Sequence, residues 1–114
     1  GIKIKDLDRI LFCSSTSDWT SPAAASHVQL LLGVDCPAED KQVACASFIY
    51  GIDHAARLIA TGLNYVLVIG SDVKSKFTNP SDKRFLPIFA DGAGAVVLGP
   101  CEKNYGLLLC ELWT

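Results

Sequence analysis

Residues 42–62, QVACASFIYGIDHAARLIATG, decide the fold predicted for this chain. The stretch begins with a short apolar run, turns at Cys45-Ala46-Ser47 and continues as an amphipathic helix that ends at Gly62. Asp53 and Arg57 stand one turn apart, as expected of a surface ion pair. Apolar residues recur at about 3.6-residue spacing and predict one buried face: Phe48, Ile52, Ala55, Ala56 and Ile59.

Cys45 is the strongest candidate for chemistry. It comes directly before the predicted helix, where unpaired backbone amides and the positive end of the helix dipole make a thiol most easily ionised and nucleophilic. The alternative is a cysteine packed into the core at an ordinary strand-to-helix turn, and position alone leaves both interpretations open. A thiolate nucleophile also needs an acid/base partner and an oxyanion hole.

The other elements alternate between strand and helix. Apolar runs predict strands at residues 9–14, 65–70, 93–98 and 106–113, and a short edge strand at 42–44. A helix is predicted at 23–32, with Ser21 as its cap and Pro22 as its first residue, and a loop at 34–41. This order predicts a three-layer α/β/α domain with a mixed, mostly parallel sheet. At least one of the last two strands should run antiparallel, because a tight turn can join them.

Composition narrows the classes of partner. The 114 residues suit one domain, but half of them are hydrophobic and the mean hydropathy is +0.32, so the chain should bury large faces against a partner or belong to a larger body. A net charge of -2 without a basic cluster gives no reason to expect nucleic acid or an anionic membrane. No apolar run is long enough to span a bilayer, and the first residues do not resemble a signal peptide.

The cysteines favour a reducing compartment. Their number is odd and no CxxC spacing occurs, so a disulfide framework or a metal site is not expected, and a cytoplasmic location is. The five are Cys13, Cys36, Cys45, Cys101 and Cys110.

Neither histidine offers an obvious base for Cys45. His54 lies nine residues further along the same helix, about 13 Å along the axis, and cannot reach the thiol. His27 falls within the first helix and is expected at a surface or interface. The glycine-rich run FADGAGA, residues 89–95, lacks the lysine of a phosphate-binding loop and precedes a strand, so Asp91 should bond nearby amides in a structural role.

Four motifs together carry a resemblance to a known family. ACASF at 44–48, VIGSD at 68–72, NPSDKR at 79–84 and FADGAGAVVLG at 89–99 resemble, in order and spacing, β-ketoacyl-acyl-carrier-protein synthase III of the thiolase superfamily. The upstream segment 14–33 is similar to the family as well. The resemblance implies that residues 1–114 are one thiolase-like half-domain, an internal part of the N-terminal half that lacks the family's first strand and its C-terminal half.

The resemblance also implies an activity. Cys45 would accept an acyl group from acyl-coenzyme A, its own backbone amide would form part of the oxyanion hole, and the acyl group would then be extended with malonyl-acyl-carrier protein in fatty-acid biosynthesis. The family's assisting histidine and asparagine lie in a second half-domain, and nothing in this chain matches them. Lys83 matches a cationic position near the coenzyme A adenine, with Arg84 beside it. Ser47 replaces the glycine usual after the cysteine-alanine pair.

The resemblance further implies a cytoplasmic homodimer in which the strand before Cys45 pairs with its copy, with acyl-coenzyme A and acyl-carrier protein as partners and no cofactor or metal. Two other hypotheses stay open at this point. One is a non-catalytic thiolase-fold module for dimerisation or acyl binding, which the missing base favours. The other is an α/β hydrolase with a cysteine nucleophile, which would need His27 within reach of Cys45.

Overall fold

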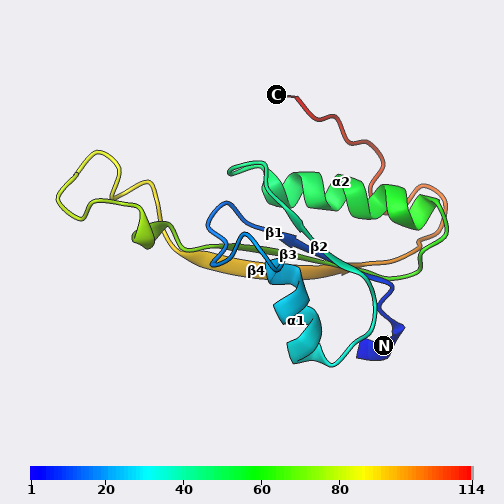
Figure 1. The fold of residues 1–114 in the computed structure, drawn as a ribbon. Helices are drawn as coiled ribbons and strands as arrows, with labels where there is room; N and C mark the ends of the chain where they lie inside the picture. The colour runs from blue at the N-terminus through cyan, green and yellow to red at the C-terminus, as the bar shows by residue number, and fades with distance from the viewer. Residues whose placement is uncertain (114) are drawn as a thin grey trace.

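The computed structural model describes residues 1–113 and shows a four-stranded sheet between two helices (Figure 1). The sheet order is β2-β1-β3-β4. In chain order the main elements are β1 (Arg9–Cys13), α1 (Ala24–Leu32), β2 (Ala38–Lys41), α2 (Ser47–Ala60), β3 (Val66–Asp72) and β4 (Gly92–Leu98). Two 3-10 turns, Ile4–Asp6 and Lys74–Lys76, lie before β1 and after β3.

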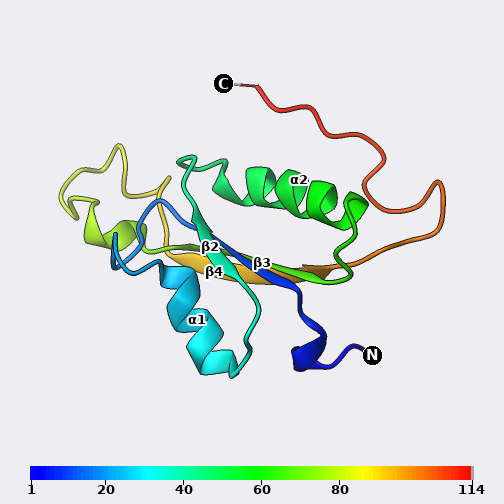
Figure 2. The same ribbon diagram turned by 45° about the vertical axis from the view of Figure 1, so that its right-hand side comes forward.

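The predicted three-layer α/β/α architecture is confirmed. The two helices cover opposite faces of the sheet, as Figures 1 and 2 both show. β1 runs parallel to β2 and to β3, whereas β4 runs antiparallel to β3, with Val66 opposite Leu98 and Asp72 opposite Gly92 at the two ends of the ladder. The sheet is therefore mixed and mostly parallel, with the predicted antiparallel strand at one edge.

The continuous apolar run of β1 is explained by burial on both of its faces. Leu11 and Cys13 join the core under α2, whereas Ile10 joins the core under α1. Alternate side chains of a strand point to opposite faces, so a strand between two helical layers needs apolar residues at every position. This central strand positions the residues that follow it at the carboxyl edge of the sheet.

The amphipathic helix forms largely as predicted. Most of its apolar stripe packs on the sheet, but Ala56 lines a groove beside the end of β4 instead. Arg57 donates to the Asp53 carboxylate at 2.8 Å, which confirms the predicted surface pair. The helix ends at Ala60, and Gly62 follows with a φ of 120°, a conformation that favours glycine.

The predicted cap of the first helix is wrong. α1 begins at Ala24, after the predicted Ser21 cap and Pro22 start, and has no capping side chain of its own. Instead the carboxylate of Asp40 accepts the amides of Ala24 at 2.9 Å and Ala25 at 2.8 Å. A neighbouring strand therefore supplies the anion that first-turn amides prefer.

The edge strand lies earlier than predicted. Residues 38–41 form β2, where a loop was expected, and residues 42–44 lie outside any strand, with only an isolated bridge between Val43 and Cys45. The sequence AEDK of β2 carries three charges and gives no apolar signal. Charged residues suit a short edge strand, because one side of it faces no neighbour.

The strand predicted at 106–113 does not form. This segment has no regular secondary structure and passes over α2 on the side away from the sheet (Figures 1 and 2). Its apolar side chains are exposed there: Leu107, Leu108, Leu109 and Trp113. A strand needs an adjacent backbone for its hydrogen bonds, and α2 offers none. Within residues 1–113 no helix is long and apolar enough to cross a membrane.

Candidate active site

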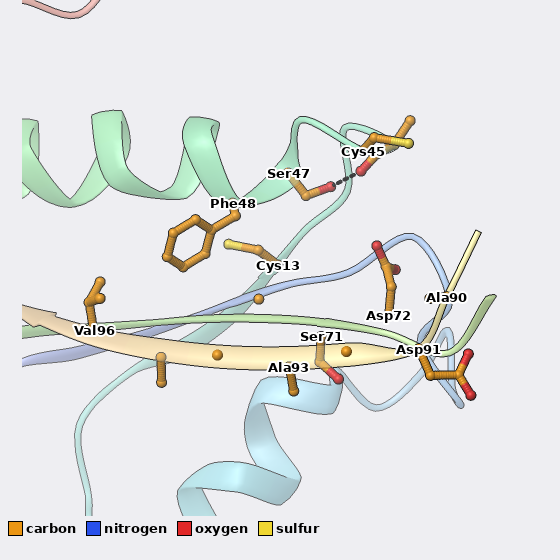
Figure 3. A pocket seen from close by; sticks show the side chains of 15 residues that line it. Cys13, Cys45, Ser47, Phe48, Ser71, Asp72, Ala90, Asp91, Ala93 and Val96 are labelled. Atoms are coloured by element: carbon orange, nitrogen blue, oxygen red, sulfur yellow. Dashed lines mark hydrogen bonds between the residues drawn. The ribbon is translucent and has the colours of Figure 1, made fainter. Parts of the chain in front are cut away.

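A pocket of about 490 Å³ lies where the start of α2 faces the carboxyl end of β3 and the first residues of β4. Figure 3 shows Cys13 and Phe48 between α2 and the sheet, and Cys45 at the loop that precedes the helix. Small residues form much of the wall on the β4 side, because the run from Ala90 to Ala95 contains only alanine, glycine and Asp91. The pocket thus occupies the edge of the sheet where ligands of open α/β folds bind.

Cys45 lines this pocket and is exposed. The residue before it, Ala44, has a φ of 46°, in the left-handed region that a non-glycine residue rarely adopts. The backbone therefore turns sharply between residue 43 and the first residue of α2, Ser47. This turn presents the sulfur at the amino end of a 14-residue helix, as the sequence predicts.

The backbone amide of Cys45 finds no hydrogen-bond acceptor among residues 1–113. The next two amides along the chain do have acceptors, because Ala46 donates to the Val43 carbonyl at 3.0 Å and Ser47 to the Ala44 carbonyl at 3.3 Å. A free amide beside a nucleophilic atom is suited to stabilise an oxyanion.

The Ser47 side chain fixes this turn. Its Oγ accepts the Val43 amide at 2.8 Å and donates to the Ala44 carbonyl oxygen at 2.7 Å, the bond drawn at Ser47 in Figure 3. Ser47 is 4% exposed, so water cannot readily replace either partner. From the sequence alone, this serine is visible only as a departure from the pattern of the family that the chain resembles.

Cys13 lines the same pocket but is only 2% exposed. Burial raises the pKa of its thiol to about 11, more than the nearby Lys41 lowers it, and Asp40 raises it slightly further. The thiolate is the reactive form of cysteine, so Cys13 is unreactive near neutral pH. All five cysteines are free in the structure.

Asp72 lines the far side of the pocket at the end of β3. Its carboxylate accepts the Ser15 amide at 2.9 Å, the Ser15 hydroxyl at 3.0 Å and the Thr16 hydroxyl at 3.2 Å. Partial burial raises the pKa of Asp72, but these bonds and the nearby Lys74 ammonium outweigh burial and lower it overall. The carboxylate is therefore ionised and ties the loop after β1 to the end of β3. The sequence run VIGSD places Asp72 at the end of an apolar strand, but the sequence alone gives Asp72 no functional role.

Asp91 has the predicted structural role, although its partner lies far along the chain. Its carboxylate accepts the backbone amide of Ser75 at 2.8 Å and the Ser75 hydroxyl at 2.6 Å. These bonds lower the pKa of Asp91. They connect the start of β4 to the turn after β3.

Neither histidine lines the pocket. His27 stacks on Trp19, with ring centroids 4.2 Å apart, and His54 lies with Nδ1 3.9 Å from Oε1 of Glu39. Because His27 does not line the pocket, the hydrolase hypothesis lacks the base that it needs. The position of His54 agrees with the prediction that His54 cannot reach the Cys45 thiol.

Lys83 and Arg84 lie in the long segment between β3 and β4, and neither lines the pocket. The Arg84 guanidinium pairs with Asp82 at 2.8 Å and lies 5.6 Å from the centre of the Phe85 ring. Their assignment to coenzyme A binding stays a prediction. Among residues 1–113 no group of three or more histidine, cysteine or acidic side chains could hold a metal ion.

Comparison with known proteins decides the family. The profile described as 3-Oxoacyl-[acyl-carrier-protein (ACP)] synthase III matches residues 40–113. The chain belongs to this family. Two relatives named beta-ketoacyl-acyl-carrier-protein synthase III are similar: that of Vesicomyosocius okutanii is 42% identical over 100% of this chain and 36% of its own length, and that of Geobacillus kaustophilus is 44% identical over 98% and 37%.

Solved structures of synthase III agree with the fold. The enzyme from Thermus thermophilus superposes with a TM-score of 0.85 at 30% identity, over 90% of this chain and 32% of its own. The enzyme from Pseudomonas aeruginosa gives a TM-score of 0.81 at 35% identity, over 87% and 32%. The chain thus spans about a third of the length of the synthase III proteins that it matches.

Proposed function

We propose that the protein is a condensing acyltransferase of fatty-acid biosynthesis that carries its acyl group on Cys45. The observation that supports this best is the exposed sulfur at the amino end of α2, beside a pocket and a free backbone amide. The sulfur is accessible to a substrate, and the helix start beside it favours negative charge.

In the proposed first step the Cys45 thiolate attacks the thioester carbonyl of an acyl-coenzyme A. The tetrahedral oxyanion receives a hydrogen bond from the Cys45 amide, and its collapse breaks the bond to the coenzyme A sulfur, which leaves as a thiolate. The product is an acyl thioester on Cys45. In the second step malonyl-acyl-carrier protein loses carbon dioxide, and the resulting carbanion attacks the acyl carbonyl and releases the Cys45 thiolate.

The second step needs groups that the described residues do not bring to the pocket, since neither histidine lines it. The relatives are about three times as long as this chain. We therefore assign the decarboxylating histidine and asparagine of the resemblance to a second half-domain. No cofactor or metal is needed for either step, because both thioesters are already activated.

We also propose the substrates, the cellular location and the oligomeric state. Acyl-coenzyme A and acyl-carrier protein would be the substrates, with Lys83 and Arg84 near the coenzyme A adenine, in the cytoplasm. A homodimer is proposed through the outer edge of β2, which is an end strand of the sheet, rather than through residues 42–44, which lie outside any strand. Light scattering of the purified protein tests this dimer.

The decisive experiment is acyl transfer. The protein, expressed from its complete natural reading frame, is mixed with acetyl-coenzyme A, and its intact mass and acetylated peptide are measured. We expect one acetyl group on Cys45, and a loss of at least about a thousand-fold in rate for Cys45→Ser, by analogy with other nucleophile replacements.

Cys101→Ser is the matched control, because Cys101 is also exposed but donates to the Tyr105 carbonyl far from the pocket. It should leave the rate unchanged. A folded, dimeric protein that accepts no acyl group would instead favour the non-catalytic module.

A further inference from the structure

The Ser47 hydroxyl group joins two backbone groups that come just before Cys45 in the chain. It accepts the amide of Val43 and donates to the carbonyl of Ala44. The Ala44 carbonyl also accepts the Ser47 amide at 3.3 Å, so two donors from one residue hold it.

The Ala44 carbonyl and the Cys45 amide belong to one peptide unit. A trans peptide is planar, and its C=O and N–H bonds point in opposite directions. Holding the carbonyl toward the first turn of α2 therefore directs the Cys45 N–H away from that turn. This orientation agrees with the observation that the amide has no acceptor among the described residues.

The turn that carries this peptide is strained at the residue before Cys45. Ala44 lies at a φ of 46°, where a non-glycine residue is strained, so the turn needs a restraint to stay in this geometry. A flip of this peptide would turn the N–H inward and the carbonyl oxygen outward, toward the place where negative charge develops on an acyl group.

We infer that Ser47 is a positioning residue that aims the Cys45 amide at the oxyanion formed during acyl transfer. This inference rests on the proposed function and adds to it a residue that the family pattern does not supply, because glycine is usual at this position. Ser47 acts through the peptide unit, because its hydroxyl is engaged by the Val43 amide and the Ala44 carbonyl.

The test compares two reactions of the same sulfur. Acyl transfer from a thioester passes through an oxyanion, whereas alkylation by iodoacetamide displaces iodide directly and forms none. If Ser47 orients the amide, Ser47→Ala in the protein from its complete reading frame should slow acyl transfer about tenfold. Alkylation of Cys45 should change by less than about twofold, since it needs no oxyanion donor.

Thr61→Ala is the matched control. Thr61 lies at the other end of α2, and its hydroxyl donates to the carbonyl three residues earlier, that of Leu58, at 2.9 Å, as Ser47 does to Ala44. It should leave both reactions unchanged. Ser47→Gly provides a second variant should Ser47→Ala fail to fold, and the same separation of the two rates is expected for it.

Using two acyl donors distinguishes a failure of the inference about Ser47 from a failure of the proposed function. Acetyl-coenzyme A tests the natural donor, and the acetyl thioester of N-acetylcysteamine tests acyl transfer without coenzyme A recognition. Transfer from the small thioester alone would overturn the proposed donor and still test Ser47. Wild-type acyl-transfer rates in Ser47→Ala, or equal slowing of acyl transfer and alkylation, would overturn the inference; absence of transfer from both donors would overturn the inference and the function together.

Discussion

β3 and β4 are hydrogen-bonded neighbours along seven residue pairs, yet one strand is covered and the other is not. Val68 of β3 is fully buried, whereas its partner Val96 on β4 is 41% exposed. The residue type, the strand pairing and the position along the ladder are the same. What differs is the layer above each strand, because the buried core under α2 contains Val68 but not Val96.

The same contrast recurs two residues further along, where Gly70 faces Gly94. A Cβ atom on Gly70 would lie 2.9 Å from Cδ2 of Phe48, whereas a Cβ on Gly94 would meet nothing within 4 Å. The pocket beside Cys45 lies across this boundary, since both glycines line it. Its wall on the β3 side is held by packing against α2, and its wall on the β4 side is open.

The largest expected effect is a difference in stability between the alanine variants of Val68 and Val96. Val68→Ala removes two buried carbons and leaves a cavity, which should lower the free energy of unfolding by about 2–3 kcal/mol. Val96→Ala removes carbons that are already partly in water and should cost less than about 1 kcal/mol. Urea unfolding of both variants measures the difference.

Equal losses for the two valines would contradict the contrast. They would mean that β4 is covered in solution by another copy or by further parts of the polypeptide. Comparing the 114-residue chain with the protein from its complete reading frame would then show which of the two covers it.

A somewhat smaller effect is expected for the glycine pair. Gly70→Ala forces the Phe48 ring to move, which should cost about 1–3 kcal/mol, as overpacking usually does. It should also slow acylation of Cys45, because Phe48 lines the pocket. Gly94→Ala enters open space and should be close to neutral in both measurements, which are urea unfolding and the acetyl-transfer rate. A neutral Gly70→Ala would show that the helix is free to shift away from β3.

The comparison of strands also explains which parts of the fold could be predicted from sequence. β1, β3 and α2 each carry an apolar pattern that their burial requires, so the pattern predicts them. β2 is a charged edge strand whose register depends on its neighbour, and no local pattern marks it. The run 106–113 has the pattern of a strand but no neighbouring backbone to pair with, and pairing is not a local property.

The candidate site likewise has one part that the sequence predicts and another that depends on contacts no local pattern shows. Cys45 could be predicted because a helix start is visible in the sequence and because the four motifs resemble a known family. The free amide beside it depends on the strained turn at Ala44 and on the two bonds of the Ser47 hydroxyl, which no spacing reveals. The Asp40 cap of α1 was missed for a similar reason, since donor and acceptor are 15 and 16 residues apart.

The smallest effect concerns the two carboxylates at the pocket end of the ladder, Asp72 at the end of β3 and Asp91 just before β4. Hydrogen bonds lower the pKa of both in the folded state, for Asp72 against the opposing effect of partial burial. A carboxyl group with a depressed folded pKa stabilises the protein fully above its unfolded pKa, about 3.9. That contribution is lost as the pH falls through the folded pKa.

Asp72→Asn should therefore destabilise the protein at pH 7, and the difference from wild type should shrink as the pH falls below about 4. Asp91→Asn should show the same trend with a smaller amplitude, because Asp91 is exposed and the hydrogen bonds of 2.8 Å and 2.6 Å to its carboxylate both come from Ser75, whereas Asp72 accepts from three consecutive residues after β1. Urea unfolding at pH 7, 4 and 3 measures both. A larger acid-sensitive contribution from Asp91 would mean that the turn before β4, rather than the covered end of β3, holds this side of the pocket together.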